Sequence, residues 1–339
     1  VGGLAEEKCQ PVRFLAGPPV AEGLGLVPLA RQVAADGRST AVLEARVADA
    51  RGNPVAGVPV LLSVKGVGTL LERRVLTGED GKAPARVRSK QTGASTVTLR
   101  LEGTALTRSE RVAFVAGSPD QHGSTVRVVR ESAPADGRTP LEVSVRVLDA
   151  EENPVRGRYV SLRLVGVGSE QLKRAGPTDE DGTASVDFTS VLAGEGTVSA
   201  ELEGARPGEP SLPIAEPRTV RFTAGLPGKP SLSVEPPRGR AGQALQLTVE
   251  VWDESHRNPL SGAEVRWDAR GSSEALTLAP SRTDAQGRAT VSLTPARSGN
   301  VTFVAKVRGE AGQPEVTGSI NVGIDSGPPQ EVRLGVESG

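Results

Sequence analysis

The stretch Asp49–Gly57, which reads DARGNPVAG, decides the fold of this chain because it occurs three times. It returns as DAEENPVRG at Asp149–Gly157 and, one residue longer, as DESHRNPLSG at Asp253–Gly262. In such a stretch the aspartate bonds nearby backbone amides, the asparagine tolerates a left-handed conformation, and the proline forces its predecessor into extended geometry. The pattern therefore predicts the same turn in three copies of one unit.

Three further landmarks follow each turn in the same order, at intervals of about 100 residues. They are T-x-x-x-G-x-A, a glycine shortly before a strand-like run, and a closing F-x-A-G. These landmarks lie at 77–83, 178–184 and 283–289; at Gly93, Gly194 and Gly299; and at 114–117, 222–225 and, in weaker form, 320–323. The threonine ends a strand, and the glycine after it supplies the positive φ for the return.

Apolar and polar residues alternate with period two around these landmarks, as in the run Leu141–Val147. This alternation places one face of a strand in a core and the other in water. Each copy contains about seven such runs with turn signals every 8–12 residues, which is typical of a β-sandwich. No run has a helical stripe of useful length. The fold class is therefore predicted as all-β, with three sandwich domains in tandem.

The composition constrains the cores and the cross-links. Only 2% of residues are aromatic and methionine is absent, so the cores are built from Val, Leu and Ala. Cys9 is the single cysteine, which excludes an intrachain disulfide. No apolar stretch approaches the roughly 18 residues that span a bilayer. A strand of about 10 residues makes a domain about 35–40 Å long, so three in line predict an elongated array on the order of 110–130 Å.

The predicted domains are residues 18–117, 118–225 and 226–323. Residues 1–17 are interpreted as the last strand of a preceding repeat or a flanking strand, since Val12–Gly17 matches Val220–Gly225. Residues 324–339 are interpreted as a junction and the first strand of a following repeat, or a tail. These interpretations predict a segment cut from a longer array. The alternative is that the end strands pair with other copies by strand addition.

The charge pattern and the scarcity of reactive residues exclude several functions. The formal net charge is −1, with 40 basic and 41 acidic residues and no basic stripe, so nucleic-acid binding is not expected. The two histidines, His122 and His256, occupy non-equivalent loops without partner motifs. Nothing resembles a nucleophile with its base or a zinc site. The chain is therefore predicted not to be an enzyme and to need no cofactor.

Acidic loops at Glu79-Asp80 and Asp179–Asp181 leave weak calcium binding as an alternative, although they lack the ligand density of a dedicated site. The third copy differs from the others at its start and contains both tryptophans. Trp267 has the inward phase of its strand and is predicted to fill the core. Trp252 has the outward phase and is the one candidate contact residue, or it covers a junction between repeats.

Twelve residues of the repeated motifs are predicted to be structural turn residues. They are Asp49, Asn53, Pro54, Gly81, Asp149, Asn153, Pro154, Gly182, Asp253, Asn258, Pro259 and Gly287.

An A-D-G start, an alternating strand, D-x-x-G-N-P-V and T-x-x-x-G-x-A together resemble the bacterial Ig-like group 1 repeat of invasin and intimin adhesins. The first copy matches best, Glu152 replaces the motif's glycine in the second, and the third has lost the A-D-G start and has an inserted residue. The resemblance covers most of residues 18–323 and supplies no binding residues. It implies disulfide-free immunoglobulin-like sandwiches exported to the cell surface or the exterior, mostly serving as stiff stalks.

These observations favour a non-catalytic spacer of a surface or secreted adhesin-like protein. Its expected partners are neighbouring repeats or other copies of itself. Two alternatives stay open: a filament or surface-assembly subunit joined through its end strands, and a module of the third repeat that binds polysaccharide or protein near Trp252. No role follows for Cys9.

Overall fold

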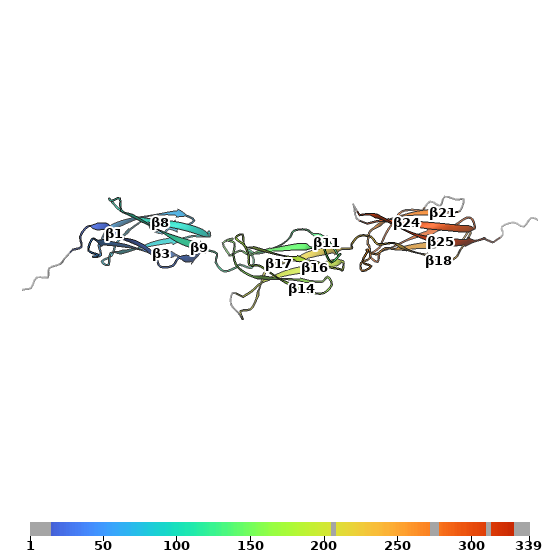
Figure 1. Ribbon diagram of the computed structural model, residues 1–339, viewed down its shortest axis with the longest axis horizontal. Coiled ribbons are helices and arrows are strands. Elements are labelled where there is room, and N and C mark those ends of the chain that lie inside the picture. Colours follow the sequence, from blue (N-terminus) through green and yellow to red (C-terminus); the bar gives the residue numbers. More distant parts are fainter. Residues whose placement is uncertain (1–14, 205–207, 272–277, 310–312, 329–339) are drawn as a thin grey trace, which may run out of the picture.

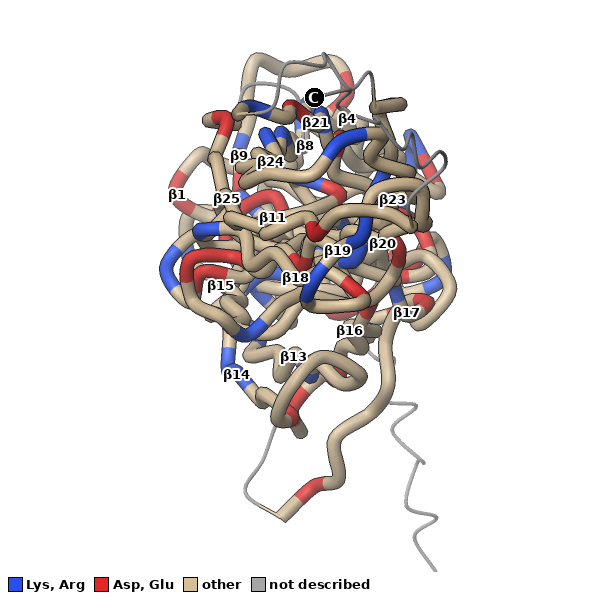
Figure 2. The backbone as a smooth tube through the Cα atoms, turned by 90° about the vertical axis from the view of Figure 1, so that its right-hand side faces the viewer, with Lys and Arg blue, Asp and Glu red and all other residues tan. Residues whose placement is uncertain are grey.

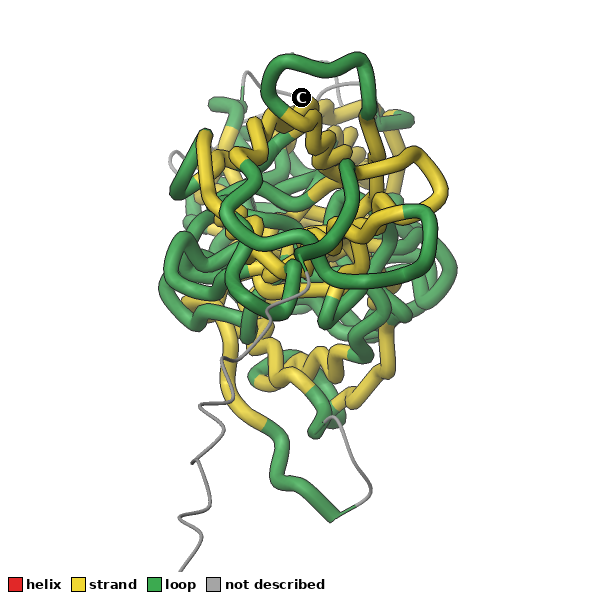
Figure 3. Tube along the Cα trace, turned by 90° about the vertical axis from the view of Figure 1, so that its left-hand side faces the viewer, coloured by secondary structure: helices red, strands yellow, loops and turns green. Residues whose placement is uncertain are grey.

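The computed structural model describes residues 15–204, 208–271, 278–309 and 313–328. Within these ranges the chain forms strands and loops and contains no helix, as Figure 3 shows in a view along the long axis. The predicted all-β fold class is confirmed. Figure 1 shows three units that follow one another along that axis.

The first unit consists of two facing sheets, with strand orders β1-β3-β7-β5 and β2-β9-β8-β4-β6. Its strands are β1 (Pro19–Pro28), β2 (Gln32–Ala34), β3 (Ala41–Asp49), β4 (Pro59–Gly66), β5 (Thr69–Leu70), β6 (Arg74–Leu76), β7 (Lys82–Arg88), β8 (Gly93–Leu101) and β9 (Thr107–Val115).

The second unit repeats this scheme, with the orders β10-β12-β15 and β11-β17-β16-β13-β14. Its strands are β10 (Thr125–Val128), β11 (Ser132–Pro134), β12 (Leu141–Arg146), β13 (Val160–Val165), β14 (Gln171–Ala175), β15 (Thr183–Phe188), β16 (Gly194–Leu202) and β17 (Leu212–Thr223).

The third unit has the orders β18-β20-β23 and β19-β25-β24-β21-β22. Its strands are β18 (Ser231–Glu235), β19 (Gly239–Arg240), β20 (Leu245–Glu250), β21 (Glu264–Arg270), β22 (Ser281–Arg282), β23 (Arg288–Leu293), β24 (Gly299–Arg308) and β25 (Glu315–Asp325).

In all three units the chain changes sheets near its start. The first long strand pairs antiparallel in the smaller sheet, and the short next strand pairs parallel with the last strand of the larger sheet, as β2 does with β9. The same parallel pairing joins β11 to β17 and β19 to β25. Both sheets are therefore tied together at the entry of the chain, without a disulfide.

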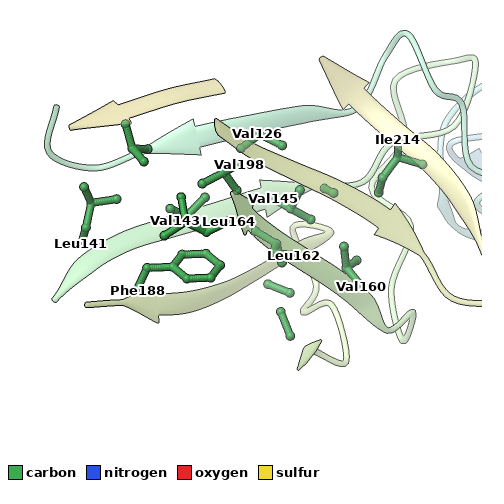
Figure 4. Packing of buried hydrophobic residues seen from close by; sticks show 14 of the residues in the cluster. Val126, Leu141, Val143, Val145, Val160, Leu162, Leu164, Phe188, Val198 and Ile214 are labelled. Carbon is green, nitrogen blue, oxygen red and sulfur yellow. The ribbon is translucent and has the colours of Figure 1, made fainter. Parts of the chain in front are cut away.

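Each core is filled from the inward positions of both sheets. In the second unit Val143, Val145, Leu162, Leu164 and Phe188 meet between the sheets (Figure 4). Their alternating neighbours on the strands lie toward solvent, as the burial pattern of β12 shows. The cores consist mainly of Val, Leu and Ala, as the composition predicts.

The strand register corrects one sequence-based assignment in the third unit. Phe114 and Phe222 lie opposite Gly93 and Gly194, whereas the residue opposite Gly299 is Ile324. The closing signature of this unit is therefore Ile324–Gly327, and the assignment to residues 320–323 was wrong by four positions. The interpreted extra strands at 1–17 and 324–339 lie largely outside the described residues.

Charges are dispersed over the molecule. Blue segments for lysine and arginine and red segments for acidic residues are interspersed along the described part of the chain in the end-on view of Figure 2. Twelve ion pairs join described side chains, and most link exposed neighbours within one sheet, as Arg46 and Glu44 do at 2.7 Å. Such exposed pairs contribute little to stability.

Candidate functional site at the repeat junctions

The aspartate of the repeated turn holds both the turn and the chain that enters the unit. One oxygen of Asp149 accepts the backbone amides of Glu151 and Asn153 at 3.0 and 2.8 Å. Its other oxygen accepts the amide of Gly117, in the linker, at 2.8 Å. The carboxylate therefore fixes the linker onto the turn.

The same arrangement occurs in the other two units. Asp49 accepts the amide of Gly17 at 2.8 Å, and Asp253 accepts that of Gly225 at 3.5 Å. A proline two residues after each of these glycines pairs with the aspartate: Pro19 with Asp49, Pro119 with Asp149 and Pro227 with Asp253. The chain thus enters all three units along one path.

Asn153 clamps the second unit onto the first. Its side-chain oxygen accepts the backbone amide of Thr92 at 2.9 Å. Its side-chain nitrogen donates to the carbonyls of Lys90 at 2.9 Å and Ala35 at 3.3 Å. All three partners belong to the first unit, and Asn153 is only 6% exposed. A buried amide that is satisfied from the neighbouring unit fixes the two units against each other.

Asn258 repeats the clamp at the second junction. Its oxygen accepts the amide of Ala193 at 2.7 Å, and its nitrogen donates to the carbonyl of Val191 at 3.0 Å. The side chain is 2% exposed. At the first junction Lys90 also forms an ion pair with Glu151 at 3.1 Å. The residue that corresponds to Lys90 at the second junction is Val191, which cannot form an ion pair. Among the described residues, the first clamp therefore has two further contacts, the ion pair of Lys90 and the bond to Ala35.

The sequence did not indicate these contacts across the junctions. Asn153 and Asn258 were expected only to shape their turns, through a left-handed backbone. That reason was wrong: the positive φ angles lie at Gly52, Glu152 and His256. A signal was present, because all three copies keep Asn-Pro while the preceding residue changes from Gly52 to Glu152 to Arg257.

The threonine and glycine of the T-x-x-x-G-x-A landmark stabilise the turn through hydrogen bonds. The hydroxyl of Thr178 donates to the carbonyl of Val155 at 2.7 Å and accepts the amide of Arg158 at 3.0 Å. Gly182 has a φ of 73°, and its carbonyl accepts the amide of Val147 at 2.8 Å. Thr77 and Gly81, and Thr283 and Gly287, occupy the same places in the other units. The turn that contains each clamp residue is thus hydrogen-bonded to the loop of the T-x-x-x-G-x-A landmark.

Three segments of the chain, residues 25–115, 123–212 and 239–320, match the model of the bacterial Ig-like domain (group 1). The chain belongs to this family. The resemblance seen in the repeated motifs is therefore confirmed. Adhesin repeats of this family are non-catalytic, so the chain is not an enzyme.

Two relatives that share part of this sequence are bacterial adhesins. The chain is 23% identical over 285 residues to the inverse autotransporter adhesin YeeJ of Escherichia coli, covering 81% of this chain and 12% of that protein. It is 30% identical over 152 residues to intimin of Citrobacter freundii, covering 43% of this chain and 16% of intimin. The chain therefore spans a small part of each relative.

A solved structure of the Escherichia coli adhesin FdeC has the same fold. It superposes with a TM-score of 0.65 at 21% identity, covering 92% of this chain and 99% of the solved chain. The likeness over most of both chains supports the fold described above.

The left-handed position of the turn offers a test of local strain in the second Ig-like repeat. Glu152 has a φ of 64°, where the first repeat has Gly52. Because a side chain at positive φ is disfavoured, Glu152→Gly is expected to raise the free energy of unfolding of this repeat by about 1 kcal/mol. Gly52→Glu in the first repeat should lower it by a similar amount. Hydrogen exchange of each repeat measures both changes in the free energy of unfolding. If the two substitutions change it in the same direction, strain at positive φ is not the cause.

The acidic loops of the Ig-like repeats are engaged by their own backbone. One oxygen of Asp179 accepts the amides of Asp181 and Thr183 at 2.9 and 2.8 Å. Among the residues that the structure describes, no group of three or more His, Cys, Asp or Glu side chains is placed to hold a metal ion. The same residues include no helix long and apolar enough to cross a membrane.

Several carboxylates in loops and at strand ends have lowered pKa values. The amide and hydroxyl of Ser39, with the amide of Arg38, lower the pKa of Asp36 to about 2. The side chain of Asn53 and the amides of Gly17 and Asn53 lower the pKa of Asp49. Burial raises the pKa of Asp253, but donors from Ser255, Arg257 and Asn258 outweigh it and lower the pKa.

These lowered values predict a loss of stability in acid. A carboxyl whose pKa is lower in the folded state stabilises the fold above its unfolded pKa of about 3.9, and this contribution disappears as the pH falls through the folded value. The melting temperature is therefore expected to fall as the pH is lowered from about 4 to about 2. Asp36→Asn keeps the acceptor but cannot ionise, so its melting temperature should fall less over the same interval. An identical fall in both proteins would exclude Asp36 as a contributor.

The two tryptophans of the third Ig-like repeat lie in different environments. Trp267 is 5% exposed and donates to the hydroxyl of Ser281 at 3.1 Å, so its predicted place in the core is confirmed. Trp252 is 37% exposed and pairs through its backbone with Pro259. Its role as a contact residue stays a prediction.

A cavity of about 790 Å³ lies at the second junction, between loops of the second and third Ig-like repeats. Two of its three acidic lining residues are bonded to neighbouring groups: Asp136 accepts the amides of Arg138 and Thr139, and Asp253 accepts from Asn258; the third acidic residue is Glu254. Arg138, Thr223 and Ser255 also line the cavity, so its lining mixes polar and apolar residues.

Proposed function

We propose that the chain is a non-catalytic spacer in the stalk of a bacterial surface adhesin, in which asparagine clamps keep successive repeats in line. The observation that carries the proposal is the bonding of Asn153 and Asn258 to backbone groups of the preceding repeat. The relatives are bacterial adhesins, which supports a location on the cell surface.

The clamps matter for a spacer because a covalent linker alone allows bending. Each junction has two separate attachments: the aspartate holds the linker glycine, and the asparagine holds a loop of the preceding repeat. The linkers are short and contain Pro119 or Pro227, which limits their own swing. Two attachments beside a short linker restrict both bending and rotation.

Small-angle X-ray scattering over a concentration series tests the proposal. A spacer predicts a constant mass of 35.0 kDa. It also predicts a maximum dimension above about 100 Å, as expected for three domains in line. A compact monomer would contradict the proposal. A mass that grows with concentration would instead favour the filament subunit joined through its end strands.

Titration with candidate glycans, followed by tryptophan fluorescence, tests the remaining alternative of a binding module near Trp252. A spacer predicts no quenching. Saturable quenching that is lost in Trp252→Ala would favour binding by the third repeat.

A further inference from the structure

The first repeat presents an asparagine at the same place as the two clamps, but on an exposed surface. Asn53 is exposed, whereas Asn153 and Asn258 are buried. Its side-chain nitrogen donates to Asp49 at 2.9 Å. Its side-chain oxygen has no hydrogen-bond partner among the described residues. This end of the first repeat, which Figure 3 views from outside, is formed by loops.

The backbone around Asn53 has the same hydrogen-bonded arrangement as at the two junctions between described repeats. Asp49 accepts the amide of Gly17 at 2.8 Å, the same length as the bond from Gly117 to Asp149. Pro19 pairs with Asp49 as Pro119 pairs with Asp149. The exposed carboxamide is therefore held in the position from which Asn153 bonds the preceding repeat.

The groups that such a carboxamide takes are the same at both occupied junctions. They are a backbone amide and the carbonyl two residues earlier, in the loop that leads into the strand beginning at Gly93 or Gly194. Because both groups are main-chain atoms, recognition does not depend on the side chains of that loop. The third repeat has the corresponding exposed pair, the carbonyl of Ala296 and the amide of Ser298, before Gly299.

We propose that the Asn53 end of the first repeat is a docking surface for the loop end of another group 1 Ig-like repeat that is covalently joined through the chain entering at Gly17. Two or three hydrogen bonds contribute too little to offset the freedom lost when two separate molecules associate. A covalent neighbour reaches the surface at a high effective concentration. The inference is that Asn53 makes the same contacts as Asn153 and Asn258, and it therefore rests on the proposed function.

A tandem fusion of two chains tests the proposal, with residues 1–327 of one copy followed by residues 18–339 of the second. The join reads Gly-Pro-Pro, as at Gly17–Pro19 and at Gly327 onward in the chain itself. The readout is hydrogen exchange at the amide of Ser298 in the upstream copy. Docking predicts exchange slower by at least roughly tenfold than at the free end of the downstream copy.

Asn53→Ala in the downstream copy should return exchange at the upstream Ser298 to the rate of the free end. The amide of Thr92 in both copies is the internal control, because it reports the Asn153 clamp. Unchanged exchange at Ser298 beside a protected Thr92 would overturn the docking proposal and leave the proposed function standing. Fast exchange at Thr92 would show that the Asn153 clamp does not form, and it would overturn the proposed function as well. Protection of Ser298 in the unfused chain that rises with concentration would overturn the covalent neighbour in favour of a second copy.

Discussion

Gly182→Ala is expected to lower the free energy of unfolding of the second repeat by about 3 kcal/mol or more. Gly182 has a φ of 73°, which an alanine adopts only with strain. A Cβ atom there would lie 2.5 Å from the carbonyl oxygen of Val147 and 3.2 Å from the Cα atom of Pro154. These obstacles are backbone atoms of a buried turn and have no side-chain freedom with which to move away.

The displaced atoms also carry hydrogen bonds that hold the turn. The carbonyl of Val147 accepts the amide of Val155 at 2.9 Å, and the carbonyl of Gly182 accepts the amide of Val147 at 2.8 Å. Separating the two loops weakens both bonds in a buried region, which adds about 1–3 kcal/mol for each group left unpaired. We therefore expect the loss to exceed that of an ordinary glycine replacement.

Gly157→Ala is the matched control. Its φ is 77°, nearly that of Gly182, but no atom lies within 4 Å of the Cβ position. The expected loss is about 1–2 kcal/mol, from backbone strain alone. Hydrogen exchange of the second repeat as a function of denaturant measures both variants in the full chain. Equal losses would show that the close approach of the two loops contributes nothing.

Much of the fold could be predicted because period-two alternation and turn chemistry act locally. The run from Leu141 to Val147 directs its apolar side chains inward whatever the rest of the chain does, and the structure buries them. Alternation does not fix the register along a strand, however. A shift by four residues keeps the same face inward, so alternation did not exclude the assignment to residues 320–323, whereas the pairing of Ile324 with Gly299 places the signature at residues 324–327.

The clamps could not be predicted for a different reason. The partners of Asn153 are a main-chain amide and two main-chain carbonyls. Any residue supplies the carbonyl and any residue except proline supplies the amide, so the sequence of the loop around Thr92 does not indicate the contact. The sequence shows only that the asparagine recurs. Its role depends on how one folded unit meets the next, which is a property of the assembled array.

Asn153→Ala is expected to uncouple the first two repeats while leaving both folded. The change removes three hydrogen bonds to the first repeat and buries the amide of Thr92 without its acceptor. We expect the coupling between the repeats to fall by about 2 kcal/mol, because each lost bond contributes about 0.5–1.5 kcal/mol and some of the freed groups regain water. Exchange at the amide of Thr92 should accelerate by one to two orders of magnitude.

Two matched variants separate the clamp from other effects of the change. Asn53→Ala removes the same bond to the turn aspartate, since Asn53 donates to Asp49 as Asn153 donates to Asp149, but it breaks no bond across a described junction. Lys90→Ala keeps the carbonyl that Asn153 uses and removes only an exposed ion pair, which contributes about 1 kcal/mol or less. Neither variant should change exchange at Thr92 by more than a few-fold.

Small-angle scattering of the same three variants connects the clamp to shape. If Asn153 holds the repeats in line, its loss broadens the distribution of distances and shortens the average length, whereas Asn53→Ala and Lys90→Ala retain the profile of the unmodified chain. Accelerated exchange at Thr92 without a change in shape would mean that the short linker through Pro119 and the bond from Gly117 to Asp149 suffice to keep the repeats aligned. In that case stiffness would reside in the aspartate, and Asp149→Ala would be the variant that bends the chain.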